Sequence, residues 1–75
     1  MYKPTTEEVA RLENNFTYHA PKEGQQERYV AIREECKQLG ACLLLLCPPS
    51  RERSLALKHL EDTMMWANAS IARNE

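Results

Sequence analysis

Apolar side chains repeat with helical spacing over two long stretches of this chain. In residues 25–47 and again in residues 51–72 they recur every seven residues, along two rows in each stretch. The rows are Tyr29, Cys36 and Leu43, with Ile32, Leu39 and Leu46, and then Leu57, Met64 and Ile71, with Leu60 and Ala67. This spacing is typical of the seam between two packed helices. We therefore expect two long helices, joined as an antiparallel hairpin.

Local signals predict where the helices begin and end. Pro48 and Pro49 interrupt the pattern, because proline lacks the N–H that a helix needs, and Ser50 is a favourable N-cap for the helix that follows. Within residues 1–15, the Thr5-x-x-Glu8 pattern is a capping box and predicts a short helix over residues 6–14. Residues 16–24 are irregular, since a proline and a glycine interrupt them, and we expect a loop there that binds ligand. The whole chain is thus predicted to be one all-α hairpin domain, residues 1–75.

The apolar surface exceeds what one hairpin can cover. Residues 41–47 are apolar on every face of the predicted helix, which is typical of a helix that is buried all round. Further apolar side chains outside the seam are Leu44, Leu45, Leu55, Met65 and Trp66. One hairpin is a single layer, and a stable domain needs at least two layers. We therefore expect a compact homo-oligomer with closed symmetry.

Composition excludes several classes of function. The formal net charge is −1, and acidic and basic residues are interleaved along the chain, which argues against binding of polymeric nucleic acid. The first residues do not form a signal peptide, and the longest apolar run is far short of the ~20 residues that span a bilayer. We therefore expect a cytoplasmic protein without a membrane partner.

Catalytic and metal-binding patterns are missing from the sequence. Three cysteines lie inside the apolar helical run, so we expect them to be buried packing residues rather than disulfides, zinc ligands or nucleophiles. His19 and His59 form no metal-binding pair, and the two glycines form no phosphate-binding loop. The sequence predicts no enzyme, no metal and no cofactor.

Ligand-binding chemistry is concentrated in the segment Asn15–Lys22, where an aromatic ring, an imidazole and a cation lie close together. The ring of Tyr18 can stack on a nucleobase, while Lys22 or Arg33 can hold a phosphate. The alternative is that Tyr18 packs on the hairpin and Arg33 pairs with a neighbouring glutamate. Arg51 opens the second long helix, where free N–H groups attract anions. The alternative to this anion-binding role is that Arg51 is solvated and that Glu52 screens its charge.

The segments that carry this chemistry resemble a known family. Tyr18–Lys22, Glu27–Arg33 and Lys37–Ala41 are similar to the phage anti-CBASS sponge proteins. Pro49–Leu57, Met65–Asn68 and Ile71–Asn74 resemble the helical hairpin that these proteins share with phage anti-Thoeris sponges. The likeness runs through nearly the whole chain from Asn15 onward.

The resemblance implies a homohexamer that sequesters immune signalling nucleotides without cleaving them. It implies that Tyr18 stacks on a base of a cyclic dinucleotide and that Arg33, where the family has a lysine, holds phosphate. It links Arg51 to a separate pocket for cyclic trinucleotides. His19, in the same segment as Tyr18, completes the candidate set together with Lys22 and Arg28, which are added because they lie near it.

The predicted function is a phage sponge for cyclic dinucleotides such as cGAMP, and also for cyclic trinucleotides, that blocks CBASS defence in the cytoplasm of the infected bacterium. Two alternatives stay open. One is an anti-Thoeris sponge that takes a cyclic ADP-ribose isomer. The other is a helical oligomeric adaptor that binds a protein partner through the apolar excess around Leu44 and Trp66.

Overall fold

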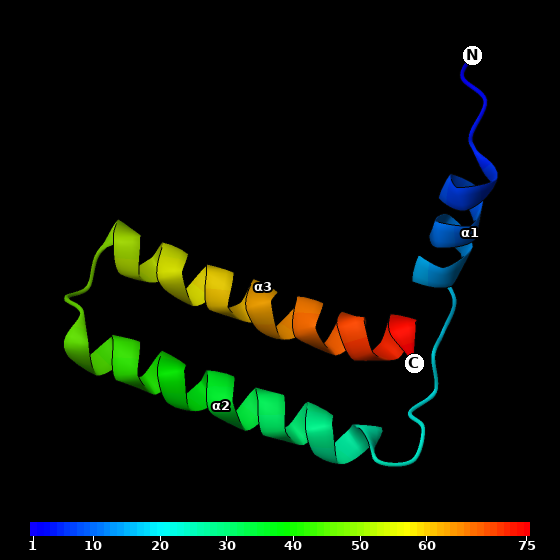
Figure 1. The fold of residues 1–75 in the computed structure, drawn as a ribbon. Helices are drawn as coiled ribbons and strands as arrows, with labels where there is room; N and C mark the ends of the chain where they lie inside the picture. The colour runs from blue at the N-terminus through cyan, green and yellow to red at the C-terminus, as the bar shows by residue number, and fades with distance from the viewer.

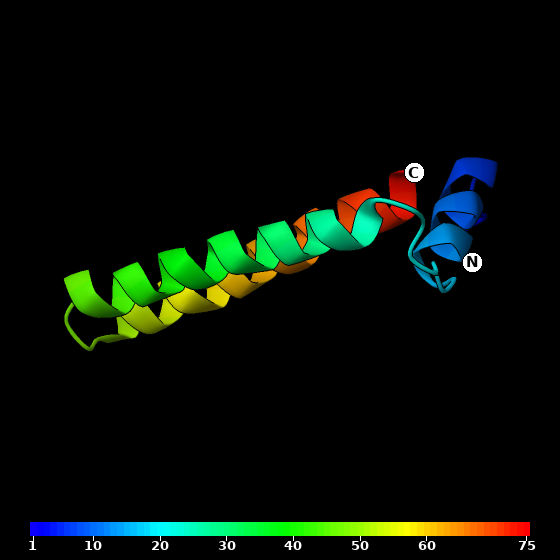
Figure 2. The same cartoon turned by 90° about the horizontal axis from the view of Figure 1, so that it is seen from below.

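The computed structural model describes residues 1–75 and consists of three helices without strands. These are α1 (Thr6–Asn15), α2 (Gln25–Leu46) and α3 (Arg51–Asn74). Helices α2 and α3 run antiparallel and side by side along their length, and α1 stands across the open end of this hairpin, near the end of α3 (Figures 1 and 2). The all-helical class and the hairpin are therefore confirmed. No helix of the structure combines the length and the apolar character that crossing a membrane requires.

The helix ends follow the local signals of the sequence. Thr5 Oγ1 accepts a hydrogen bond from the N–H of Glu8 at 3.0 Å, and the N–H of Thr5 donates to Glu8 Oε1 at 2.8 Å. These bonds lower the pKa of Glu8, because they stabilise its charged form. Ser50 Oγ accepts from the N–H of Arg53 at 3.1 Å. The two predicted caps are therefore present.

Arg53 has a structural role at the turn of the hairpin. Its Nη1 donates to the carbonyl oxygens of Leu44 and Cys47, at 3.3 and 3.2 Å. The last carbonyls of a helix lack partners within the helix, and a cation stabilises them. Arg53 therefore ties the start of α3 to the end of α2.

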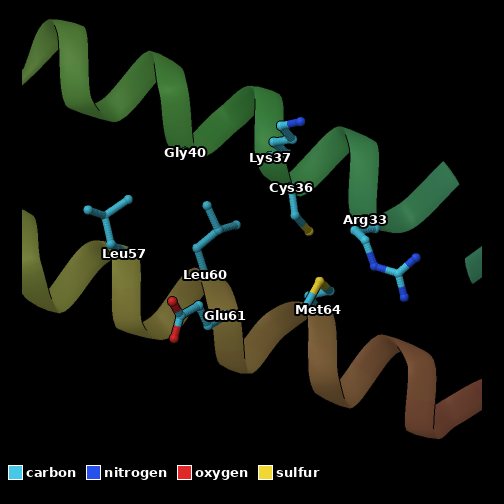
Figure 3. A pocket seen from close by; sticks show the side chains of 8 residues that line it. All are labelled: Arg33, Cys36, Lys37, Gly40, Leu57, Leu60, Glu61 and Met64. Carbon is cyan, nitrogen blue, oxygen red and sulfur yellow. The ribbon is translucent and has the colours of Figure 1, made fainter. Parts of the chain in front are cut away.

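The seam between α2 and α3 uses one of the two predicted rows of α2. Cys36 and the other residues of its row are half-buried, and Cys36 lies at the seam with the half-buried Leu57, Leu60 and Met64 of α3 (Figure 3). The second row is only partly correct: Ile32 is half-buried, but Leu39 is exposed and Leu46 is 77% exposed. The physical reason is that α3 is the one long neighbour of α2, so one face of α2 meets it and the row beside that face reaches solvent.

No hydrophobic side chain is fully buried in the single chain. The one buried residue is Gln25, which is 3% exposed. The expectation that the three cysteines are buried is wrong for this chain, because Cys42 is exposed and Cys36 and Cys47 are half-buried. The physical reason is that each helix has only one long neighbour, so its outer face meets solvent.

Candidate functional site

Polar contacts anchor the loop between α1 and α2. His19 Nε2 donates to the carbonyl oxygen of Asn14 at 2.8 Å, and the N–H of Lys22 donates to Gln25 Oε1 at 2.9 Å. The alternative in which Tyr18 packs on the hairpin is not formed, since Phe16 and Tyr18 are both exposed, Tyr18 by 83%. Hydrogen bonds to the helix ends replace ring burial. The ring of Tyr18 is therefore free to meet a ligand or another chain.

Two of the predicted cations are already engaged with Glu75. Arg28 Nη1 donates to Glu75 Oε2 at 2.7 Å, its Nη2 bonds the other carboxylate oxygen, and Gln25 Nε2 donates to that oxygen at 3.3 Å. The Lys22 ammonium bonds the main-chain oxygen of Glu75. These contacts lower the pKa of Glu75 to about 2, chiefly through Arg28 and then Gln25. We call Lys22, Gln25, Arg28 and Glu75 the clasp, because they join the start of α2 to the end of α3.

Arg33 lies at a hollow of about 310 Å³ between the loop, α2 and α3. Its lining residues are His19, Tyr29, Arg33, Asn68, Ala69 and Ala72. Arg33 is exposed and takes part in none of the salt bridges or side-chain hydrogen bonds of the chain. Its pairing with Glu34 or Glu35, the alternative reading of the sequence, is not formed. The guanidinium is therefore available to an anion.

Asn68 contributes an unpaired acceptor to the same hollow. Its Oδ1 is buried and has no hydrogen-bond partner. A buried polar atom without a partner costs about 1–3 kcal/mol relative to a satisfied one, so Oδ1 of Asn68 lacks a stabilising donor in the single chain. Arg33 and Asn68 together provide a cation and an acceptor at one site.

Arg33 also lines a second, more apolar hollow of about 360 Å³ along the hairpin seam (Figure 3). In this view Arg33 marks one end of the hollow, and Leu57 marks the other. The seam hollow is lined by apolar side chains and by three charged ones, Arg33, Lys37 and Glu61. The guanidinium thus lies where two concave surfaces meet.

The structure gathers four of the six candidate residues into two groups: His19 and Arg33 at the hollow, and Lys22 and Arg28 at Glu75. Tyr18 precedes His19 but does not line the hollow, and Lys22 and Arg28 belong to the clasp. Arg51 is exposed at the start of α3, at the opposite end of the hairpin (Figure 1).

Sequence reasoning missed four lining residues, of which two are polar, Tyr29 and Asn68, and two are alanines, Ala69 and Ala72. Tyr29 had been assigned only to the seam. Asn68 stands four residues after Met64 and four before Ala72, so it shares their helix face. An amide within that otherwise apolar face was the available signal.

The structure contains no cluster of three or more His, Cys, Asp or Glu side chains that could hold a metal ion. The chemistry of the hollow is therefore described by its guanidinium, imidazole, phenol and amide groups.

Comparison with known proteins identifies the family. The family model described as "Acb2/Tad1, hairpin domain" matches residues 8–72, which include the loop, all of α2 and most of α3. No curated protein and no solved structure gives a significant match. The resemblance stated from the sequence is confirmed by this match. The chain therefore belongs to the Acb2/Tad1 hairpin-domain family, which in general implies a phage sponge for cyclic nucleotides.

Proposed function

We propose that this chain sequesters cyclic dinucleotides, such as cGAMP, without cleaving them, and thereby blocks CBASS defence in the cytoplasm of the infected bacterium. The observation that carries the proposal is the hollow lined by Arg33, whose guanidinium is unpaired, and by Asn68, whose buried Oδ1 is unpaired. A phosphate satisfies the first group, and an N–H of a base satisfies the second. Family membership supports binding rather than catalysis as the activity.

Each residue has a distinct task in this proposal. Arg33 holds a phosphate oxygen through its planar fork of donors. Tyr18, whose ring is exposed, stacks on a base, a contact worth about 1–3 kcal/mol. His19 holds the loop against α1 through its bond to Asn14 and lines the hollow. Lys22 and Arg28 act through the clasp, which fixes the loop that presents Tyr18.

A second copy of the chain completes the site. The hollow of about 310 Å³ is at the lower end of the range of about 300–1,000 Å³ for small-molecule sites, so one chain encloses only part of a cyclic dinucleotide. The exposed apolar side chains, including Leu45, Met65 and Trp66, provide the surface on which copies meet. We propose a closed homo-oligomer, a hexamer by the resemblance, with the nucleotide enclosed between copies.

Arg51 marks a separate proposed site, for cyclic trinucleotides. It is exposed beside the N-terminus of α3, and it takes part in no salt bridge. Because Arg51 begins α3 at the turn of the hairpin, whereas Arg33 lies within α2 and lines a hollow with residues 68–72 of α3, the two sites can be tested independently.

The experiment compares Arg33→Ala with Lys58→Ala by isothermal titration with cyclic dinucleotide. Both variants remove one exposed positive charge, and Lys58 lies outside the hollow on α3. A charge-assisted hydrogen bond is worth about 1.5–3 kcal/mol, so Arg33→Ala should weaken binding about tenfold or more. Lys58→Ala should bind like the parent protein. Equal binding by the parent and Arg33→Ala would contradict the assignment.

The second candidate function is an anti-Thoeris sponge for a cyclic ADP-ribose isomer, because the matching family model covers two kinds of protein, Acb2 and Tad1, with one hairpin domain. The same titration with a cyclic ADP-ribose isomer decides between them. Tight binding of this ligand, together with failure of cyclic dinucleotides to bind, would favour the second candidate.

A further inference from the structure

His19 joins the loop to α1 and has one ring nitrogen without a partner. Its Nε2 lies 2.8 Å from the carbonyl oxygen of Asn14. A carbonyl oxygen can only accept a hydrogen bond, so Nε2 must carry the hydrogen. The other nitrogen, Nδ1, takes part in none of the side-chain hydrogen bonds or salt bridges of the chain. The tautomer of the neutral ring is therefore fixed, and Nδ1 is the nitrogen that can take up a proton.

The hollow that His19 lines has one charged group, and that group is positive. Its other titratable or charged members are Arg33 and Tyr29 of α2, whereas α3 lines it only with uncharged side chains. From α1, a backbone carbonyl faces the imidazole. Lys22, on the same loop, is bound to Glu75 in the clasp. No carboxylate therefore lines the hollow to balance a second positive charge beside Arg33.

An anion in the hollow changes the electrostatic balance at His19. A like charge disfavours the charged form of a titratable group, whereas an opposite charge within about 4–6 Å favours it by about tenfold or more. Histidine ordinarily changes its charge between about pH 5 and 8, so an imidazole can respond near neutral pH. Both nitrogens of the protonated ring are donors. One then bonds the carbonyl of Asn14, and the other is available to a phosphate oxygen.

We propose that His19 takes up a proton when an anionic nucleotide enters the hollow, and that the imidazolium and Arg33 hold the phosphate together. The proton comes from solvent and goes to Nδ1, and no covalent bond of the ligand breaks. This role rests on the proposed function of the hollow, and it goes beyond holding the loop against α1. Binding of the nucleotide is thereby linked to pH.

Isothermal titration with cGAMP, in two buffers of different ionisation enthalpy, measures the protons taken up on binding. At about pH 6.5 the parent should take up a fraction of a proton, at most one, for each nucleotide in the hollow. Affinity should rise about tenfold as the pH falls from about 8 to about 5, because the phosphodiesters stay anionic while the imidazole gains its charge. His19→Gln retains an N–H that can donate to the carbonyl of Asn14, but its amide takes up no proton. It should show no proton uptake and a smaller change of affinity with pH.

His59→Gln is the matched control, since the chain has only these two histidines. His59 lies on α3 outside the hollow, and its Nδ1 is 3.7 Å from a carboxylate oxygen of Asp62. This variant should bind cGAMP and take up protons like the parent. In the parent, the imidazole signals in NMR spectra, assigned with the help of His59→Gln, give a second readout. Addition of cGAMP should move the His19 signal toward its protonated position and leave the His59 signal in place.

The outcomes separate this role from the proposed function. Binding of cGAMP without proton uptake, or with an unmoved His19 signal, would overturn the role of His19 and leave the proposed function standing. Equal proton uptake by the parent and His19→Gln would also overturn it, because another group would then be the one that titrates. Failure of cGAMP to bind at any pH would contradict the proposed function, and the role of His19 with it.

Discussion

The two glycines of this chain should respond in opposite directions to the same substitution. Gly40 lies inside α2, and Gly24 precedes α2 with a φ of +80°. We expect Gly40→Ala to raise the free energy of unfolding and Gly24→Ala to lower it. Both changes add one methyl group, so each variant serves as the chemical control for the other.

The expected magnitudes come from the surroundings of each glycine. A Cβ at Gly40 would lie 3.5 Å from Leu60 Cδ2 and 3.9 Å from Leu57 Cδ2, which is ordinary van der Waals contact. Alanine is favoured over glycine inside a helix by about 1 kcal/mol, so Gly40→Ala should gain about that amount. A Cβ at Gly24 meets no atom within 4 Å, but left-handed geometry costs a non-glycine residue about 1–2 kcal/mol. Gly24→Ala should lose about that amount.

Thermal unfolding followed by circular dichroism measures both effects. For a chain of this size, 1 kcal/mol corresponds to a shift in Tm of about 4–8 °C. The protein concentration is held constant, because association shifts apparent stability. Gly40→Ala should unfold at a higher temperature than the parent, and Gly24→Ala at a lower one. A lower Tm for Gly40→Ala would refute the helix contact that we describe, and an unchanged Tm for Gly24→Ala would refute the left-handed turn.

Two further predictions concern the clasp and the turn of the hairpin. The folded pKa of Glu75 is about 2, below the ordinary 4.5, so the stability it contributes is present above pH 4.5 and is lost as the pH falls through about 2. As the pH falls over that window, the Tm of the parent should decrease more than the Tm of Glu75→Gln. An equal decrease in both proteins would argue against the clasp. Arg53→Ala removes hydrogen bonds to two carbonyls at the end of α2 and should lower the free energy of unfolding by about 1 kcal/mol in urea titration. Arg51→Ala, a neighbouring arginine without those bonds, should have little effect, and an equal loss in both would contradict the role of Arg53.

The hairpin could be predicted from sequence because its signals are local. Pro48, Ser50 and the Thr5-x-x-Glu8 box act within a few residues, and each has the predicted effect on a helix end. The exposure of Leu46 and Cys42 could not be predicted in the same way. Burial depends on how each helix is rotated about its axis and on what covers its outer face, and a seven-residue spacing determines neither.

The candidate site could be predicted only in part. Arg33 and His19 were identified from residue type and resemblance, and they do line one hollow. The engagement of Arg28 by Glu75 joins residues 47 positions apart, which no local pattern indicates. The unpaired oxygen of Asn68 is likewise a product of packing between helices. Contacts between residues far apart in the sequence therefore determine which cations are left without a carboxylate partner.

Recovery of the ligand after binding tests the central claim most directly. The protein is incubated with cyclic dinucleotide, its mass is measured under native conditions, and the ligand is then released by denaturation and identified. We predict a homo-oligomer that carries the nucleotide and releases it intact, with less ligand recovered from Arg33→Ala. Release of a hydrolysed nucleotide would contradict a sponge, and so would an oligomer that carries none.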